Sequence, residues 1–297
     1  MIEVRELYKS FDGFQALKGL NINVPKGAVY GLVGPNGAGK STVIRHIAGI
    51  YRQDSGEVLI EGEPVFENIT MKERIAYIPD EIFYYSQANI KDMMQFYRSI
   101  YSNFSTERFE KLGEAFRIDP KTPMRKLSKG MQKQVAFWLT LSCCPDYIIL
   151  DEPVDGLDPV MRRQVWSLLL SDVAERGVTV LVSSHNLREL EDVCDHVGIM
   201  DHGRLLLERS LSQLQDNMVK IQLALPEGKE LPEGLELVHE SRTGRLRQLI
   251  VRGREEELSA KLMAAEPLFM DVLPLSLEEI FIYELGGAEH EIKDIIL

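Results

Sequence analysis

Alternation of apolar and polar residues marks the first part of the chain as β structure. Between residue 1 and about residue 30, apolar side chains recur at every second position, and turn-forming residues interrupt the pattern at Asp12-Gly13 and Pro25-Lys26-Gly27. Period-two alternation is typical of strands that bury one face. We therefore predict an antiparallel β layer here. Its apolar positions are Ile2, Val4, Leu20, Ile22 and Val24.

Three short runs further along are almost entirely apolar, which is typical of parallel strands covered on both faces. They occupy residues 28–33, 147–150 and 178–182, and helix-like patterns occupy residues 42–48 and 135–141. Such strands alternating with helices predict an α/β core built on a parallel sheet.

Between residues 80 and 127 the pattern becomes helical and rich in aromatic residues. Ile90, Met93, Met94 and Tyr97 recur at helix spacing and form one apolar stripe. Most stripes of this kind pack into a core, but Met and aromatic side chains also suit a groove that accepts a partner helix. We predict a helical subdomain over residues 80–130 and leave both interpretations of the stripe open.

The character of the sequence changes again beyond Gly203. Helical patterns cover residues 255–265 and a capped start at Ser276. The alternating runs that predict strands are residues 219–225, 235–238 and 246–251. We therefore predict a small α+β domain over residues 216–297, which follows a larger domain over residues 1–215.

Composition and charge limit the classes of protein to which this chain can belong. The chain has 297 residues, of which 44% are hydrophobic and 27% charged, as in ordinary α/β proteins. No apolar run approaches the roughly 20 residues that cross a bilayer, and the first residues do not resemble a signal peptide. We expect a cytoplasmic protein, so that any transport role requires a separate membrane-spanning partner.

The formal net charge of −12 argues against a nucleic-acid partner, because binding to a phosphate backbone depends on Lys and Arg contacts. Cys143, Cys144 and Cys194 lack metal-ligand spacing and suit a reducing compartment. We expect the adjacent pair, Cys143 and Cys144, to be buried as small hydrophobic side chains.

Residues 34–42 have the spacing of a phosphate-binding loop. Glycines let backbone N–H groups turn toward phosphate oxygens, a helix N-terminus adds its positive dipole end, and Lys40 adds a full charge. Ser41 is then the expected Mg²⁺ ligand. The predicted nucleoside triphosphate site consists of Gly34, Pro35, Asn36, Gly37, Ala38, Gly39, Lys40, Ser41 and Thr42.

Two acids follow the apolar run at residues 147–150, which places them at the carboxyl edge of the parallel sheet beside this loop. Asp151 is predicted to support Mg²⁺, and Glu152 to polarise the attacking water as a general base. The alternative for an Asp-Glu pair after a strand is a helix N-cap, which the nearby phosphate loop disfavours.

Further motifs stand in a fixed order along the chain. Leu127-Ser128-Lys129-Gly130-Met131 precedes the acidic strand, Gly156-Leu157-Asp158-Pro159 follows it, and Ser183-Ser184-His185 ends the run at residues 178–182. With the phosphate loop, this order resembles the ATP-binding-cassette family over residues 1–215. In that family the first motif is the signature loop, the second the D-loop, and the last carries the switch histidine, here His185.

The resemblance implies an ATP- and Mg²⁺-dependent ATPase that drives a separate permease from the cytoplasmic face of the cell membrane. Two cassettes of this family close head-to-tail, so Ser128 and Gly130 are expected to contact the nucleotide of the opposite subunit. The resemblance also implies that Asp158, in the D-loop, is a nucleotide-binding residue. Phe11 stands where the family places an aromatic ring against adenine. Phe14 is the competing choice.

Two departures from the family pattern carry information. Lys129 and Met131 replace the usual Gly and Gln of the signature, a variant similar to drug-exporter subunits with separate permease chains. Asp80 stands where the family usually has the Q-loop glutamine; a carboxylate there can face Mg²⁺ or the attacking water.

Two functions are alternatives to a transporter ATPase. One is a non-transport cassette ATPase, which the acidic charge disfavours. The other is a nucleotide-gated module without turnover, which Asp80 suggests.

Overall fold

The computed structural model describes residues 1–211, 218–226 and 228–284. The chain divides into two compact units, which we call the first unit (Met1–His185 with Val193–Glu208) and the second unit (Asn186–Asp192 with Arg209–Leu297). The predicted boundary between residues 215 and 216 lies outside the described residues.

The first unit is built on a six-stranded sheet whose neighbours from β9 to β6 run parallel. The predicted α/β class is therefore confirmed. In spatial order its strands are β10 (Arg204–Ser210), β9 (His196–Asp201), β3 (Val29–Val33), β8 (Thr179–Ser184), β7 (Tyr147–Asp151) and β6 (Ile75–Ile78).

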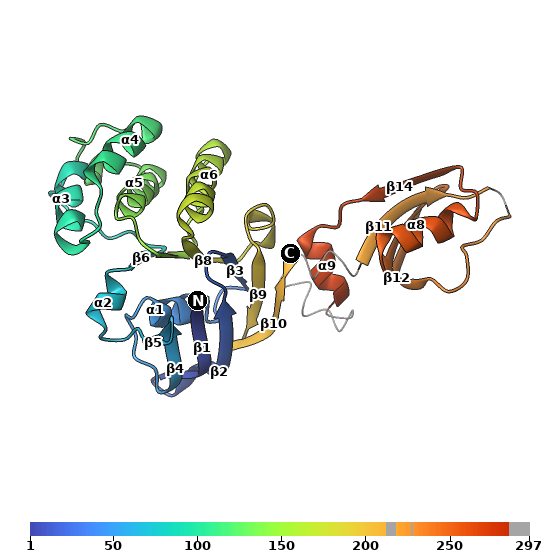
Figure 1. Cartoon of the computed structure of the whole chain (residues 1–297), viewed down its shortest axis with the longest axis horizontal. Coiled ribbons are helices and arrows are strands. Elements are labelled where there is room, and N and C mark those ends of the chain that lie inside the picture. The colour runs from blue at the N-terminus through green and yellow to red at the C-terminus, as the bar shows by residue number, and fades with distance from the viewer. Residues whose placement is uncertain (212–217, 227, 285–297) are drawn as a thin grey trace. The chain divides into compact units, whose positions relative to one another are not determined.

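A second, antiparallel sheet contains the predicted amino-terminal layer. Its order is β2 (Phe14–Val24), β1 (Ile2–Phe11), β4 (Ser55–Ile60) and β5 (Glu63–Pro64). Helix α1 (Lys40–Ile47) contacts strands of both sheets (Figure 1), and apolar side chains from the sheets and the helix form one core. This packing holds the start of α1 in place at the edge of the six-stranded sheet.

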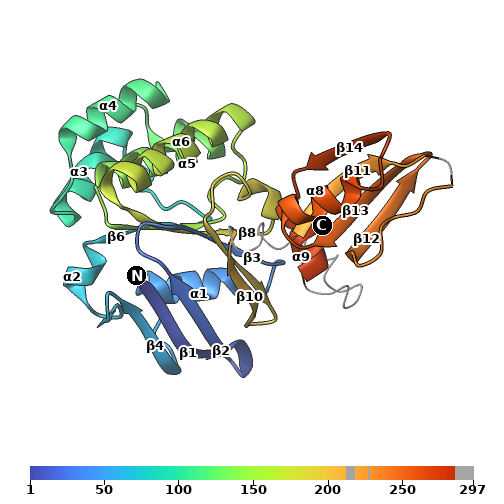
Figure 2. The ribbon, with the colours of Figure 1, turned by 45° about the vertical axis from the view of Figure 1, so that its right-hand side comes forward.

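Helices α5 (Lys129–Ser142) and α6 (Pro159–Arg176) cover the face of the six-stranded sheet opposite α1 (Figures 1 and 2). α5 packs against the other helices of the predicted helical subdomain. Trp138 stacks on Phe109 with ring centroids 4.4 Å apart, which joins α5 to α4. The remaining helical segments of the first unit are α2 (Ile69–Lys72), α3 (Ile90–Ile100), α4 (Thr106–Phe116) and the 3₁₀ turn η1 (Met124–Lys126).

The stripe on α3 is part of the core. Ile90, Met93 and Met94 are buried, and burial raises the pKa of Tyr97 to about 12. The core interpretation of the stripe is confirmed and the groove interpretation is wrong for these residues. Cys143 and Cys194 are buried, whereas Cys144 is only partly buried.

The second unit contains an antiparallel sheet with its own apolar core, as expected for an α+β domain. β14 was not predicted, because its alternation is short; it pairs with β11. Ser276 and Glu279 form the capping contacts expected at the start of α9. The elements are β12 (Glu236–Thr243), β13 (Leu246–Arg252), β11 (Met218–Ala224), β14 (Phe269–Leu273), α8 (Glu255–Met263), α9 (Leu277–Glu284) and the 3₁₀ turn η2 (Leu187–Glu189).

Within the described ranges, no helix combines the length and the apolar character that a membrane span requires.

Candidate functional site

Three neighbouring strands of the six-stranded sheet bring the site together. β8 lies between β3 and β7, and the three strands run parallel, so their carboxyl ends meet at one edge. Val33 is paired with Ser184, and Asp151 with Ser183. The phosphate loop, the acidic pair and His185 each leave one of these strands, and ligands of open α/β sheets bind at this edge.

The phosphate loop needs glycine at defined positions. Gly37 and Gly39 have φ values of 86° and 105°, a left-handed conformation that side chains other than glycine rarely adopt. A Cβ atom added to Gly34 would lie 2.2 Å from the carbonyl oxygen of Met200. No side chain caps α1 at Gly39, which leaves N–H groups of the first turn for an anion. All nine predicted residues, 34–42, lie in this loop and turn.

Lys40 lies inside the loop rather than in solvent. It is only 5% exposed, and its Nζ donates hydrogen bonds to the carbonyl oxygens of Gly34 and Pro35 at 2.6 and 3.2 Å. The same ammonium lies 3.3 Å from Glu152 Oε1. Lys40 and the candidate general base therefore form an ion pair.

Asp151 is buried and is held through one of its two oxygens. Ser41 and Ser183 donate hydrogen bonds to Oδ1 at 3.0 and 2.8 Å. Burial raises the pKa of Asp151, and the two hydroxyl donors oppose this effect only in part.

The other oxygen of Asp151, Oδ2, is buried without a hydrogen-bond partner among the described residues. A buried carboxylate oxygen beside a serine hydroxyl suits a hard cation such as Mg²⁺, which binds few protein oxygens and keeps its waters. The residues present therefore fit the predicted ion, and Ser41 and Asp151 are the side chains that would hold it.

Glu152 adopts an unusual backbone conformation and has a partner on every polar group. Its φ is 45°. Its N–H donates to Ser183 Oγ at 3.1 Å, and its carbonyl accepts from Lys133 Nζ at 2.8 Å. Its carboxylate lies between Lys40 and His185, whose Nδ1 is 3.0 Å from Oε2. This places the candidate base next to the charge that receives the phosphate.

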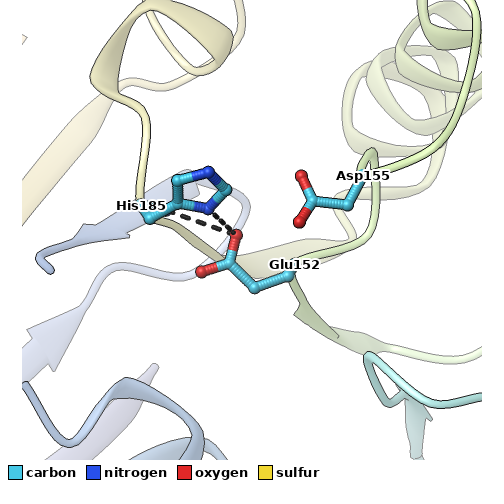
Figure 3. Close-up of side chains that lie close together, drawn as sticks. All are labelled: Glu152, Asp155 and His185. Carbon is cyan, nitrogen blue, oxygen red and sulfur yellow. Dashed lines mark hydrogen bonds and ion pairs between the residues drawn. The ribbon is translucent and has the colours of Figure 1, made fainter. Parts of the chain in front are cut away.

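Asp155 also belongs to this cluster, and sequence reasoning missed it. Ligand atoms of Glu152, Asp155 and His185 all lie within 4.8 Å of one another (Figure 3). The available signal was an acid just beyond Glu152 in the loop that leads to the D-loop motif. Asp155 thus provides a second carboxylate beside the candidate base.

Asp80 is exposed, and its ion pair is with Lys133, at 3.6 Å. No contact joins Asp80 to Ser41 or Asp151 in the described part of the chain, so its predicted role in binding Mg²⁺ stays a prediction.

Sequence reasoning also missed Lys133, although a signal existed. Lys133 precedes the buried Phe137 by one helical turn, so both share the buried face of α5.

Among the contacts of the described residues, none joins the signature loop or the D-loop to the phosphate loop of the same chain. Ser128 is exposed and caps α5, accepting the Met131 N–H at 3.2 Å. Asp158 caps α6, accepting the N–H groups of Val160 and Met161. A Cβ atom on Gly130 would lie 3.0 Å from the carbonyl oxygen of Gly156. The two loops therefore touch each other.

Phe11 and Phe14 face each other across the turn between β1 and β2, and both are exposed. Phe11 is 39% exposed and makes an edge contact with Tyr51, with ring centroids 5.5 Å apart. Lys9 lies over the Phe11 ring. Phe11 thus has a supported ring with a free surface, which is what stacking against a base requires.

Comparisons of this chain with protein-family models and with known proteins both point to ATP-binding proteins of ABC transporters. Residues 17–155 match the family model described as ABC transporter. The ABC transporter ATP-binding protein YtrB of Bacillus subtilis is 32% identical over 97% of this chain and 99% of its own length. The daunorubicin/doxorubicin resistance ATP-binding protein DrrA of Streptomyces peucetius is 34% identical over 73% of this chain and 67% of its own.

Comparison with solved structures points to the same kind of protein. A structure described as the ATP-binding subunit of an ABC transporter has a TM-score of 0.67 and 27% identity, covering 72% of this chain and 92% of its own. The similarity to YtrB extends over nearly the whole chain, including the second unit.

Proposed function

Because this chain belongs to the ABC transporter ATP-binding proteins, we propose that it is the ATPase subunit of an exporter and drives separate permease chains from the cytoplasmic face of the membrane. Members of this family bind and hydrolyse ATP. The observation that carries the proposal is the convergence of Lys40, Ser41, Asp151 and Glu152 at one sheet edge. Export is supported by the similarity to DrrA and by Lys129 and Met131 in the signature.

ATP binding exchanges the partners of Lys40. The β- and γ-phosphate oxygens take the place of the Glu152 carboxylate at the ammonium, and the loop N–H groups bind the phosphates. Glu152 is then held by His185 and is free to accept a proton. Mg²⁺, held by Ser41 and Asp151, supplies neutralisation of phosphate charge when bound.

The chemical step needs one proton acceptor. A water oxygen forms a bond to the γ-phosphorus, the bond between that phosphorus and the β,γ-bridging oxygen breaks, and ADP leaves. Glu152 accepts the proton of the attacking water. His185, 3.0 Å from Glu152 Oε2, orients the carboxylate.

The exposed signature loop supports the proposed head-to-tail dimer. Ser128 lies exposed at the start of α5, where helix N–H groups can meet a phosphate of another subunit. In this arrangement ATP joins two cassettes and ADP releases them.

A Ser128→Arg chain is expected to bind ATP through its own Lys40 loop but not to form an ATP-dependent dimer, because a bulky cation replaces a small cap where two surfaces meet. Sedimentation in ATP and Mg²⁺ on a Glu152→Gln background measures the dimer. Mixing Ser128→Arg with Lys40→Ala chains is expected to restore part of the hydrolysis, since each heterodimer keeps one intact composite site.

The matched control is Ser105→Arg, which removes the corresponding cap of α4. Both arginine variants lose about 1 kcal/mol of capping, but only Ser128→Arg is expected to abolish the dimer. An active monomer that is insensitive to Ser128→Arg would contradict the head-to-tail mechanism.

The surface that we assign to the permease consists of exposed aromatic residues near Asp80. Phe83 and Tyr85 are 66% and 49% exposed, and Tyr85 makes an edge contact with Phe96 of α3. Exposed aromatic rings beside a helical subdomain suit a short partner helix. These residues replace the buried stripe as the candidate docking surface.

The full-length chain is expected to co-purify from detergent-solubilised membranes with a polytopic membrane protein, and a Phe83→Ser/Tyr85→Ser chain to lose this partner while keeping its basal ATPase activity. Phe269→Ser, at an exposed aromatic residue of the second unit, is the control. ATPase activity stimulated by DNA or ribosomes, with no membrane partner recovered, would favour the non-transport alternative.

A further inference from the structure

Lys133 is a buried lysine in α5 whose role the motifs above do not explain. It is 7% exposed, and a buried ammonium is unfavourable unless it is paired. Its Nζ donates a hydrogen bond to the backbone carbonyl of Glu152 at 2.8 Å and lies 3.6 Å from Asp80 Oδ1. The ammonium therefore bridges the candidate base and the residue at the Q-loop position.

The sheet register explains why one lysine reaches both residues. β6 and β7 are parallel neighbours in which Ile78 is paired with Leu150. Asp80 and Glu152 each follow two residues later, so both lie just past the carboxyl edge of adjacent strands. The Lys133 side chain extends from α5 to this edge, where it contacts both residues.

The contact with Lys133 acts on the backbone of Glu152. A non-glycine residue with a φ of 45° is held in a sparsely populated conformation, which costs about 1–3 kcal/mol and persists where the surroundings fix it. The peptide before the Glu152 Cα atom is held by Ser183, and the peptide after it by Lys133. These two bonds fix the backbone from which the Glu152 side chain extends toward Lys40 and His185.

We propose that Lys133 is a positioning residue for ATP hydrolysis, which holds the Glu152 backbone in its productive conformation and shares its charge with Asp80. The inference rests on the proposed role of Glu152 as the base. Asp80 begins the segment that carries Phe83 and Tyr85. A displacement of that segment by a partner therefore changes the electrostatic environment of the ammonium that holds the base.

A Lys133→Met chain tests the proposal, because Met keeps the unbranched stem and removes the ammonium. We expect kcat to fall about 10- to 100-fold, since a misplacement of about 1 Å can cost about 10²-fold. The Kd for ATP should stay within about threefold of wild type, because the Lys40 loop is intact. Lys111→Met, at an exposed lysine of α4, is the matched control and should leave both values unchanged.

A double-mutant cycle distinguishes a positioning role of Lys133 from a purely structural role. In a Glu152→Gln chain the base is already absent, so Lys133→Met should lower the residual rate by less than about threefold. An equal fold-loss in both backgrounds, or a parallel loss of ATP affinity, would assign Lys133 to general folding stability and overturn the proposal. So would an unchanged kcat in Lys133→Met.

Asp80 provides the second arm of the test. Asp80→Asn should lower kcat by less than about fivefold, the scale of an exposed ion pair, and should have no further effect in a Lys133→Met chain. A loss that persists in the Lys133→Met chain would show that Asp80 acts independently of Lys133. If Glu152 is not the general base, the Glu152→Gln chain alone will keep full turnover. This outcome is separate from those that overturn the proposal on Lys133.

Discussion

A Glu152→Gln chain is expected to bind ATP and to hydrolyse it about 10²- to 10⁴-fold more slowly than the wild type, the range that a general base contributes. Gln is isosteric and keeps the backbone contacts with Ser183 and Lys133, but it does not accept the proton of water. Phosphate release under single-turnover conditions and equilibrium ATP titration measure the two properties separately.

The structure adds a second expectation for the same variant. The Glu152 carboxylate lies 3.3 Å from the Lys40 ammonium, so it is a competitor of phosphate for this charge. Replacing it by a neutral amide removes this competitor, so ATP affinity should be equal to or higher than that of wild type. A weaker affinity would contradict the exchange of Lys40 partners on ATP binding.

Asp155→Asn is the matched comparison for Glu152→Gln, because it also neutralises a carboxylate of the cluster in Figure 3. We expect a loss of less than about tenfold in kcat, as Asp155 makes no bond to Lys40 among the described contacts. Comparable losses in the two variants would mean that the carboxylates share the proton-accepting role.

A Lys40→Ala chain is expected to lose at least about 10²-fold in ATP affinity. Hydrogen bonds to charged groups contribute about 1.5–3 kcal/mol each, and about 1.4 kcal/mol corresponds to tenfold in affinity. Lys40 is the buried ammonium of the phosphate loop, within reach of the candidate base. Titration with ATP and with ADP measures the loss, which should be larger for ATP because it carries the γ-phosphate.

The control for Lys40→Ala must separate ligand binding from folding. Lys40 is buried, so its removal leaves Glu152 without its cationic partner and can lower the thermal midpoint. Lys91→Ala, at an exposed position of α3, is expected to change neither property. Near wild-type affinity in a folded Lys40→Ala chain would show that the assigned loop is not the phosphate site.

Much of the fold could be predicted because it depends on local periodicity. Continuous apolar runs gave β3, β7 and β8 to within about two residues, and alternation gave the β1–β2 hairpin. Six strands were not predicted: β4, β5, β6, β9, β10 and β14. For β5 and β14 the reason is that short strands at sheet edges carry weak patterns. Helix periodicity found the stripe on α3 but did not say which surface covers it.

The sequence by itself determined the phosphate loop and the acidic pair, because glycine geometry, helix dipole and charge act over a few consecutive residues. Only the tertiary structure decided how these groups are paired. The order β3, β8, β7, β6 brings Lys40, Glu152, Asp80 and Lys133 together from distant segments. Asp80 is thereby paired with the buried ammonium of Lys133. Such pairing depends on which strands are neighbours and on their register, and no local pattern encodes either.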